Sequence, residues 1–170
     1  ALKEVEAFDL NEDPGLQCVP YPMPRITRWP YSQHWEISEN TITITHEQSS
    51  TRVLNKTKDL SIPPAHIPDQ NGYSVAHLND SGDLVVTTRG FVETKWGSER
   101  GVSSSSSKVV TEVYRLVDGG YGLELEYTIT DPDYLREPVQ LGRNFRLIPN
   151  YQFTNEPCNI EAARRHLQFD

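Results

Sequence analysis

Cysteine, positive charge and long apolar runs are all scarce in this 170-residue chain. No stretch approaches the roughly 18 consecutive apolar residues that a membrane-spanning helix needs, so we expect no membrane span. The formal net charge of −8 argues against nucleic acid as a partner, because phosphate binding depends on clustered Lys and Arg. The G-x-S-x-G, P-loop and H-E-x-x-H motifs are also missing. We therefore expect neither a cofactor nor a metal ion.

The two cysteines, Cys18 and Cys158, lie 140 positions apart. They could be buried thiols, a pair of metal ligands or one disulfide, and a metal site would need distant helpers because no C-x-x-C spacing occurs. A disulfide is favoured, and closing so long a loop would remove about 5 kcal/mol of unfolded-state entropy in the chain model. It would indicate an extracytoplasmic location, secreted or periplasmic. It would also divide the chain into an N-terminal arm, residues 1–17, and a single β domain, residues 18–170.

Apolar and polar residues alternate along most of the body, which is typical of strands with one wet and one dry face. The segments that read as strands are Trp35 to His46, Thr51 to Asn55, Tyr73 to Leu78, Leu84 to Thr88, Val109 to Val117, Tyr121 to Thr130, Val139 to Leu147 and Tyr151 to Thr154. The serine-rich stretch from Gly97 to Ser107 is expected to be a mobile loop, and Ile160 to Leu167 a short helix. About eight to ten short antiparallel strands predict an all-β fold, either a sandwich or jelly roll or a closed barrel.

Several short motifs occur in a characteristic order between residues 15 and 160. They are Gly15-Leu-Gln-Cys18-Val-Pro, Pro24-Arg-Ile-Thr27, Gly72-Tyr-Ser-Val75, Asp83-Leu-Val-Val86, Gly90-Phe91, Glu112-Val-Tyr-Arg115 and Tyr127-Thr-Ile-Thr-Asp131-Pro132. In this order they resemble a family of uncharacterised exported bacterial proteins. The resemblance implies export, a β-rich domain and a disulfide, but no reaction. The chain departs from that family near residues 79–82 and 103–107, where members usually carry an acidic, Trp-containing turn and a His-Ser pair.

The N-terminal arm suggests a structural function. Residues Leu2 to Leu10 could form one extended strand, followed by a turn-rich stretch and a proline spacer. A strand placed there could pair with the sheet edge of a neighbouring copy, and repetition of that contact would build a filament. The residues of this assembly arm are Leu2, Val5, Ala7, Phe8 and Leu10. Alternatively, the arm folds back onto its own domain or is disordered.

A second hypothesis, from a different class, is a small-molecule-binding β-barrel or a barrel enzyme with a polar interior site. Five polar residues share strand faces with apolar neighbours: His46, Tyr73, His77, Glu112 and Arg143. They could line a cavity for a small apolar molecule with one anionic or carbonyl group, with Glu112 as a general base. Ordinary structural pairing of a Glu with an Arg, or of a His with a Tyr, is the alternative explanation for these residues.

Two sites match the N-glycosylation pattern. They are Asn55-Lys-Thr57 and Asn79-Asp-Ser81, and both fall at strand ends or turns, where a glycan could be accommodated.

Overall fold

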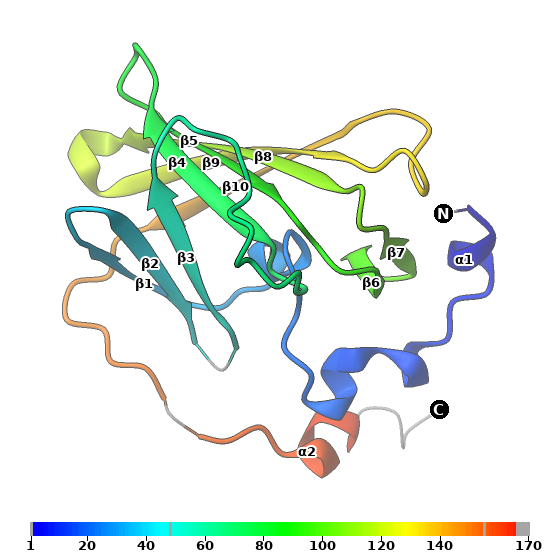
Figure 1. The fold of residues 1–170 in the computed structure, drawn as a ribbon. Helices are drawn as coiled ribbons and strands as arrows, with labels where there is room; N and C mark the ends of the chain where they lie inside the picture. The colour runs from blue at the N-terminus through cyan, green and yellow to red at the C-terminus, as the bar shows by residue number, and fades with distance from the viewer. Residues whose placement is uncertain (1, 48, 155, 166–170) are drawn as a thin grey trace.

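The fold was analysed in a computed structural model, which describes residues 2–47, 49–154 and 156–165. Its helical segments are short, and its strands occupy the middle of the chain (Figure 1). In chain order the elements are α1 (Leu2–Glu6), the 3-10 turns η1 (Leu10–Glu12), η2 (Pro14–Gln17) and η3 (Arg25–Arg28), β1 (Gln33–Ile37), β2 (Thr41–His46), β3 (Thr51–Lys56), β4 (Tyr73–Leu78), β5 (Leu84–Arg89), β6 (Thr94–Glu99), β7 (Val102–Ser104), β8 (Val109–Val117), η4 (Asp118–Gly120), β9 (Gly122–Thr130), β10 (Val139–Arg146) and α2 (Ile160–Arg164).

One eight-stranded sheet dominates, in the order β1-β2-β3-β4-β5-β8-β9-β10, and β6 pairs with β7 in a separate small sheet. The large sheet curls around one concave face (Figure 1). The predicted all-β class is confirmed. The expectation of purely antiparallel pairing is wrong at one place, because β3 and β4 run parallel. The long loop of residues 57–72 provides the crossover that a parallel pair needs. Among the described residues no pairing joins the two outer strands, β1 and β10.

The alternation in the sequence positions the strands as expected. Leu125, Tyr127 and Ile129 of β9 are buried, whereas Glu126 between them is exposed. β8 and β9 are joined by a tight turn in which Gly119 and Gly120 have φ values of 65° and 94°. Glycine adopts this region without the steric penalty of a side chain, so the Asp-Gly-Gly sequence sets the register of the longest hairpin.

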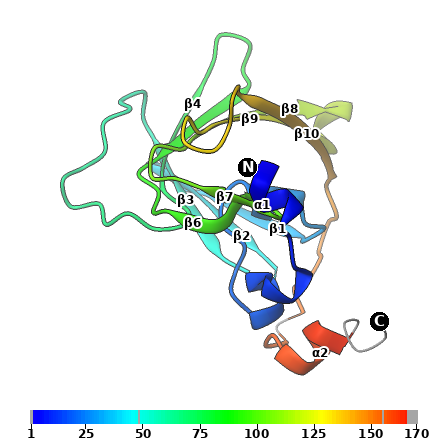
Figure 2. The same ribbon diagram turned by 90° about the vertical axis from the view of Figure 1, so that its right-hand side faces the viewer.

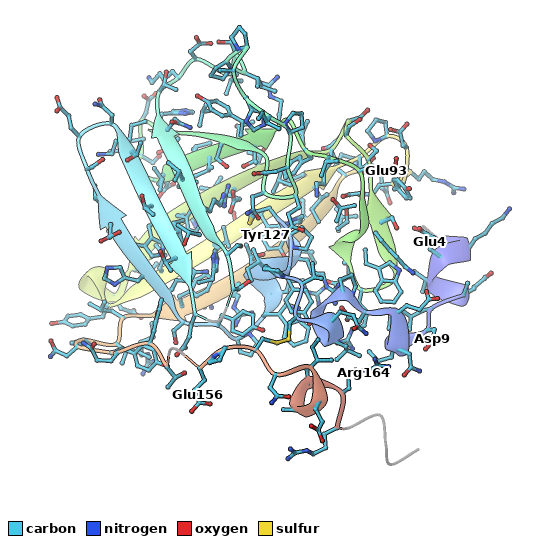
Figure 3. All side chains as sticks on the ribbon, turned by 60° about the horizontal axis from the view of Figure 1, so that its bottom comes forward. Glu4, Asp9, Glu93, Tyr127, Glu156 and Arg164 are labelled. Carbon is cyan, nitrogen blue, oxygen red and sulfur yellow. A yellow bond between two sulfur atoms is a disulfide. The ribbon has the colours of Figure 1, made fainter. Side chains whose placement is uncertain are left out.

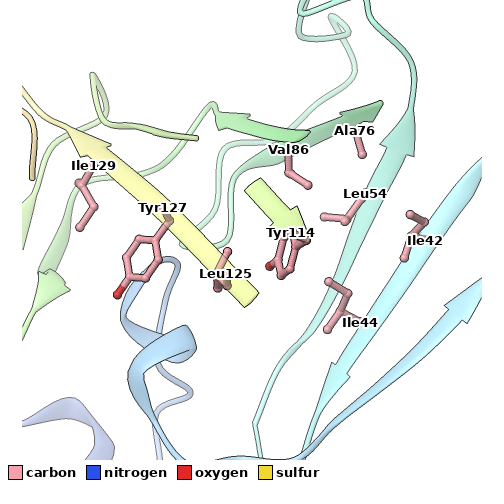
Figure 4. Close-up of a cluster of buried hydrophobic side chains, with 9 residues drawn as sticks. All are labelled: Ile42, Ile44, Leu54, Ala76, Val86, Tyr114, Leu125, Tyr127 and Ile129. Atoms are coloured by element: carbon pink, nitrogen blue, oxygen red, sulfur yellow. The ribbon is translucent and has the colours of Figure 1, made fainter. Parts of the chain in front are cut away.

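The concave face carries the main hydrophobic core. Buried side chains from six neighbouring strands meet there, as Figure 4 shows. They are Ile42, Ile44, Leu54, Ala76, Val86, Tyr114, Leu125, Tyr127 and Ile129. Because a curled sheet brings distant strands face to face, this single layer of side chains builds a core without a second large sheet.

A second cluster fills one end of the concave face. The chain segment 21–31, called the plug below, inserts Tyr21, Met23 and Ile26 against Phe91 and Val110. The predicted disulfide between Cys18 and Cys158 is confirmed, and it appears as the yellow bond in Figure 3. It ties the start of the plug to the segment before α2. The two ends of the body are thus held together at the plugged end of the sheet.

The N-terminal arm differs from the prediction. Residues expected to form one extended strand contain α1 and the turn η1 instead. Both oxygens of Glu4 accept hydrogen bonds from Ser103, and the ring of Phe8 lies 5.0 Å from that of Trp96. The arm therefore packs beside β6 and β7 of its own domain (Figure 2). Val5 and Ala7 are exposed, Leu10 is partly buried, and the side chain of Leu2 lies outside the described part of the structure.

The serine run also differs from the prediction, because residues expected in a mobile loop form β6 and β7. Three consecutive serines are buried, and each has a charged partner. Ser103 donates to Glu4, Ser104 accepts from the ammonium of Lys108, and Ser105 donates to Asp131. Serine has too little apolar surface to drive burial, but paired hydroxyls can be buried without a desolvation penalty. Apolar content alone could not reveal those partners.

Of two expectations near the C-terminus, one is wrong and the other holds for the described residues. Tyr151 to Thr154 form no strand, because the backbone N–H of Thr154 donates to the carboxylate of Glu47 rather than to a neighbouring strand. The predicted helix is present as α2, capped by the side chain of Asn159, which accepts from Ala162 N–H. His166 and Leu167, the end of the predicted helix, lie outside the described residues.

The two faces of β3 offer a matched test of the core. Leu54 is fully buried on the concave face, whereas Val53 beside it is 48% exposed. We expect Leu54→Ala to lower the free energy of unfolding by about 2–5 kcal/mol, because it leaves a cavity among close-packed side chains. Val53→Ala should cost less than about 1 kcal/mol. Urea unfolding of both variants measures the difference, and equal losses would contradict the assigned faces.

Candidate functional site

A buried polar network crosses the floor of the concave face. The guanidinium of Arg52 on β3 binds the carboxylate of Glu112 on β8 through two hydrogen bonds of 2.9 and 2.5 Å. Between these strands, Ser74 on β4 and Thr88 on β5 accept from the same guanidinium at 3.1 and 2.7 Å. The hydroxyl of Tyr114 donates to Glu112 at 2.8 Å. Four adjacent strands therefore meet in one network, in which Arg52 and Glu112 are 3% and 0% exposed.

Every N–H of the Arg52 guanidinium has a partner, since the remaining one points at the sulfur of Met23, 3.6 Å away in the plug. Burial disfavours the charged form of Arg52, but the carboxylate of Glu112 outweighs it and raises the pKa of Arg52. Burial, followed by the charge of Glu112, raises the pKa of Tyr114 well above its usual value. The pair is thus a structural Glu-Arg pairing, one of the alternatives considered from the sequence, although the arginine is Arg52 and not Arg143. Its groups are occupied and shielded from a substrate.

The five predicted cavity residues do not converge on one site. His46 is buried in the core beside Arg52, where desolvation lowers its pKa to about 4, so it is neutral at pH 7. Tyr73 packs its ring 5.5 Å from that of His66. Of the five, the lining of a hollow on the concave face includes only His77 and Arg143. The alternation of β4 places the His77 side chain on the opposite face from the core residue Ala76. Of these two residues, only Arg143 therefore projects from the concave face.

That hollow occupies the half of the concave face that the plug leaves free, with a volume of about 1700 Å³. Its floor includes Tyr114, Leu84 and Leu123, and its sides include Trp35 on β1 and Phe145 on β10. The ring of Trp35 meets that of Tyr114 edge-on, with centroids 5.1 Å apart. The hollow thus lies between the two outer strands of the sheet, and the end of the plug, Pro30 and Tyr31, forms part of its lining.

Apolar side chains dominate the rim of the hollow. Several large apolar residues that are more than 40% exposed lie along it, and nothing in the described structure covers them. They are Ile37, Leu78, Leu116, Tyr121, Leu147, Ile148 and Tyr151. Single exposed apolar residues are ordinary, but a contiguous exposed group marks a surface that binds something.

The charges along the hollow are of one sign. Its described lining includes Lys56, Lys58, Arg143 and Arg146 and no Asp or Glu. The chain as a whole has 24 acidic and 16 basic residues, so this local balance is the reverse of the global one. None of the four cations forms an ion pair with a described carboxylate, whereas six other Arg and Lys residues do. The hollow is therefore apolar and cationic.

The open side of the hollow is crossed by residues 147–154, called the strap below. It leaves β10 with a hydrogen bond from Leu147 N–H to the carbonyl of Tyr121, and continues toward Cys158. In Figure 1 the strap runs in orange past the end of β1. Its far end is fixed to Glu47, which follows β2. The carboxylate of Glu47 accepts from the hydroxyl of Tyr151 and from both N–H and hydroxyl of Thr154.

Glu47 holds the strap without a cationic partner among the described residues. The backbone N–H of Thr154, followed by the hydroxyls of Tyr151, Thr154 and Ser32, keeps its pKa below the usual value. The pattern of alternation could not reveal this contact, because Glu47 lies outside every strand and its partners in the strap are more than 100 residues away. Tyr151 and Phe153 are apolar although their segment is not a strand, because both side chains belong to the lining of the hollow.

A Ser-Lys pair lies elsewhere and is closed to substrates. The ammonium of Lys108 donates to Ser104 Oγ at 3.1 Å and to the carbonyl of Met23 at 2.7 Å. Burial lowers the pKa of Lys108 to about 7, a value suited to a general base. Both side chains are at most 1% exposed, however, so the pair serves packing. Within the described residues no three His, Cys, Asp or Glu side chains are grouped to hold a metal ion.

The two potential glycosylation sites differ in their surroundings. The side-chain nitrogen of Asn55, the atom that a glycan would modify, donates to the carbonyl of Ser74 at 3.0 Å. Asn79 shapes the β4–β5 hairpin, where its side-chain oxygen accepts from the N–H groups of Ser81 and Asp83. Modification of either residue stays a prediction.

No protein-family model, no curated protein and no solved structure matches this chain. No helix among the described residues is long and apolar enough to cross a membrane. The disulfide is compatible with an oxidising, extracytoplasmic environment. The resemblance to exported bacterial proteins stays a prediction, and function has to be argued from the site itself.

Removing one partner of the buried ion pair should be costly. We expect Glu112→Gln to lower the free energy of unfolding by about 3–5 kcal/mol, because Arg52 would remain charged, buried and without its counter-ion. Glu126→Gln is the matched control, since Glu126 is exposed on β9, and it should change stability by less than about 0.5 kcal/mol. Urea unfolding compares the two. A Glu112→Gln protein as stable as the original would refute the structural role of the network.

The strap should open when Glu47 loses its charge. We expect Glu47→Ala to raise the rate of chymotryptic cleavage at Tyr151 or Phe153 by about tenfold or more, since each hydrogen bond to a carboxylate stabilises by about 1.5–3 kcal/mol. Glu137→Ala, in an exposed loop, is the control. The pKa of Glu47 is lowered on folding, so its stabilisation is present above the unfolded-state pKa and lost as pH falls through the folded-state pKa. Acid should therefore speed cleavage of the original protein more than that of Glu47→Ala, and identical pH profiles would contradict this assignment.

Proposed function

We propose that the protein binds an elongated apolar small molecule in the hollow of its curled sheet. The observation that carries the proposal is the apolar hollow of about 1700 Å³ on one face of the sheet, whose rim consists of exposed large apolar side chains. A stable fold has no need for such a surface, because its own core and plug are already packed on the same sheet. The volume exceeds the roughly 300–1,000 Å³ of common ligand pockets, which suits a long or bulky molecule.

A binding function agrees better with the described contacts than catalysis does. The buried acid and base candidates, Glu112 and His46, are held in the core by Arg52 and by the carbonyl of Ser50. The side chains that can meet a ligand are mostly apolar or cationic, and none is a carboxylate. In this proposal the sheet acts as an incompletely closed barrel, whose missing wall between β1 and β10 is supplied by the strap.

Self-assembly through the N-terminal arm stays a prediction of lower rank. The arm is helical, and Glu4 and Phe8 already have partners within their own domain. Donation to a neighbouring copy would first have to break those contacts. Deleting residues 1–14 would also remove Asp13, whose carboxylate is the ion-pair partner of the buried Arg25. Such a deletion would therefore disturb the fold as well as any assembly.

Uptake of an uncharged fluorescent probe tests the binding function. N-phenyl-1-naphthylamine brightens when it enters an apolar site, and we expect saturable binding by the intact protein. Leu116→Glu and Leu78→Glu should each weaken binding by about tenfold, since each replaces apolar contact surface with a charge. Both residues are exposed at the rim, at 71% and 62%, so folding should be unaffected.

Ile67→Glu is the matched control, because Ile67 is 83% exposed and lies outside the hollow. It should bind the probe as the original protein does. Absence of saturable uptake, or equal weakening by all three variants, would refute the proposal.

A further inference from the structure

We infer that the ligand of the hollow is an amphipathic carboxylate, whose anionic end is held by Arg143. The inference rests on the proposed binding function and adds the chemical class and the orientation of the ligand. Its first support is the charge of the lining, which includes four cations and no carboxylate in a protein of net charge −8. A lining of this sign favours an anion and disfavours a cationic amphipath of the same length.

Arg143 differs from the other three cations in its position. It lies on the concave face of β10 between Leu141 and Phe145, and its register partner on β9 is the buried Leu125. Lys56 is exposed and its ammonium already donates to the carbonyl of Ser38 at 2.5 Å. A charge among apolar neighbours is less screened than one at an open rim, so it attracts an anion more strongly.

The guanidinium of Arg143 is anchored but not saturated. One of its nitrogens donates to the backbone carbonyl of Arg28, within the plug, and its centre lies 5.4 Å from the centroid of the Phe145 ring. These two contacts fix its direction. No other described atom accepts from it, and its remaining nitrogens are not buried. A guanidinium has five N–H donors in a planar fork, so an outward-facing edge can bind both oxygens of a carboxylate.

The two arginines of the sheet's concave face illustrate the difference. Arg52 and Arg143 project from the same face, but Arg52 uses its fork on Glu112 and is shielded by the plug. Arg143 has no Glu or Asp within ion-pair distance among the described residues, and it lies at the boundary between the plug and the hollow. A half-buried cation without a counter-ion is costly, and a ligand carboxylate would supply that counter-ion. The apolar tail would then extend over Phe145 and Leu123 toward the rim.

Displacement of the neutral probe by three molecules of equal chain length tests this inference. Laurate, dodecanol and dodecylamine share a twelve-carbon chain and differ in the charge of the head group. With the intact protein at pH 7.5, laurate should displace N-phenyl-1-naphthylamine at a concentration about tenfold lower than dodecanol. One charge-assisted interaction raises affinity by about that factor. Dodecylamine should be the weakest competitor.

Variants of Arg143 test whether this residue binds the carboxylate head group. Arg143→Gln should reduce the laurate-to-dodecanol preference to about one, whatever its effect on the affinity for the neutral probe. Arg143→Lys should retain part of the preference because charge remains without the fork. Arg136→Gln, in an exposed loop outside the hollow, is the control and should keep the full preference. Equal displacement by laurate and dodecanol, or a preference that survives Arg143→Gln, would overturn this inference and leave the binding function intact. Failure of the probe itself to bind would overturn both.

Discussion

The ion pair between Arg52 and Glu112 is the interaction on which the rest of the structure depends. It joins β3 to β8 across the concave face, with hydroxyls from β4 and β5 between them. Two buried charges are tolerated because each donor of the guanidinium has an acceptor, whereas an incomplete set would be strongly destabilising. This requirement fixes the relative positions of four strands, and so the curl of the sheet. It also fixes the plug, because Met23 covers one side of the guanidinium.

The same network divides the concave face into two unequal halves. On one side the plug and the buried Lys108 fill the space with protein. On the other side Tyr114 shares its hydroxyl with Glu112 and presents its ring to the hollow. The solid half provides stability, and the open half is free to serve recognition. A rigid floor with an apolar rim and a strap held by Glu47 is an arrangement suited to admitting a flexible, apolar molecule.

The sequence predicted the regular parts of this fold and missed the parts held by long-range polar contacts. Alternation located β2, β3, β4, β5, β8, β9 and β10, because it is a signal within each strand. The two cysteines were paired correctly, because a chain with two cysteines allows only one pairing. The predictions for the arm, the serine run and the strap were wrong for one shared reason. The contacts that hold these segments, Glu4 with Ser103, Ser105 with Asp131 and Glu47 with Thr154, join residues distant in sequence and have no signature of their own. For the site, Glu112 and Arg143 lie on the inner face, as the alternation of their strands predicted, but their partners and roles could not be assigned. The partner of Glu112, Arg52, lies in the segment Thr51–Lys56, whose sequence does not distinguish that arginine from others. The hollow could not be predicted because its size depends on how far the plug extends over the concave face.

Amide chemical shifts offer the most direct test of the central claim, that the unplugged half of the concave face is a ligand site. Titration of the ¹⁵N-labelled protein with laurate should shift the amides of β1, of β10 near Arg143 and of the strap together, with saturation at one common affinity. The amides around the buried Met23 in the plug and those of the exposed convex face around Val53 should remain in place. Shifts that are absent, or that spread over the convex face without saturation, would contradict the account.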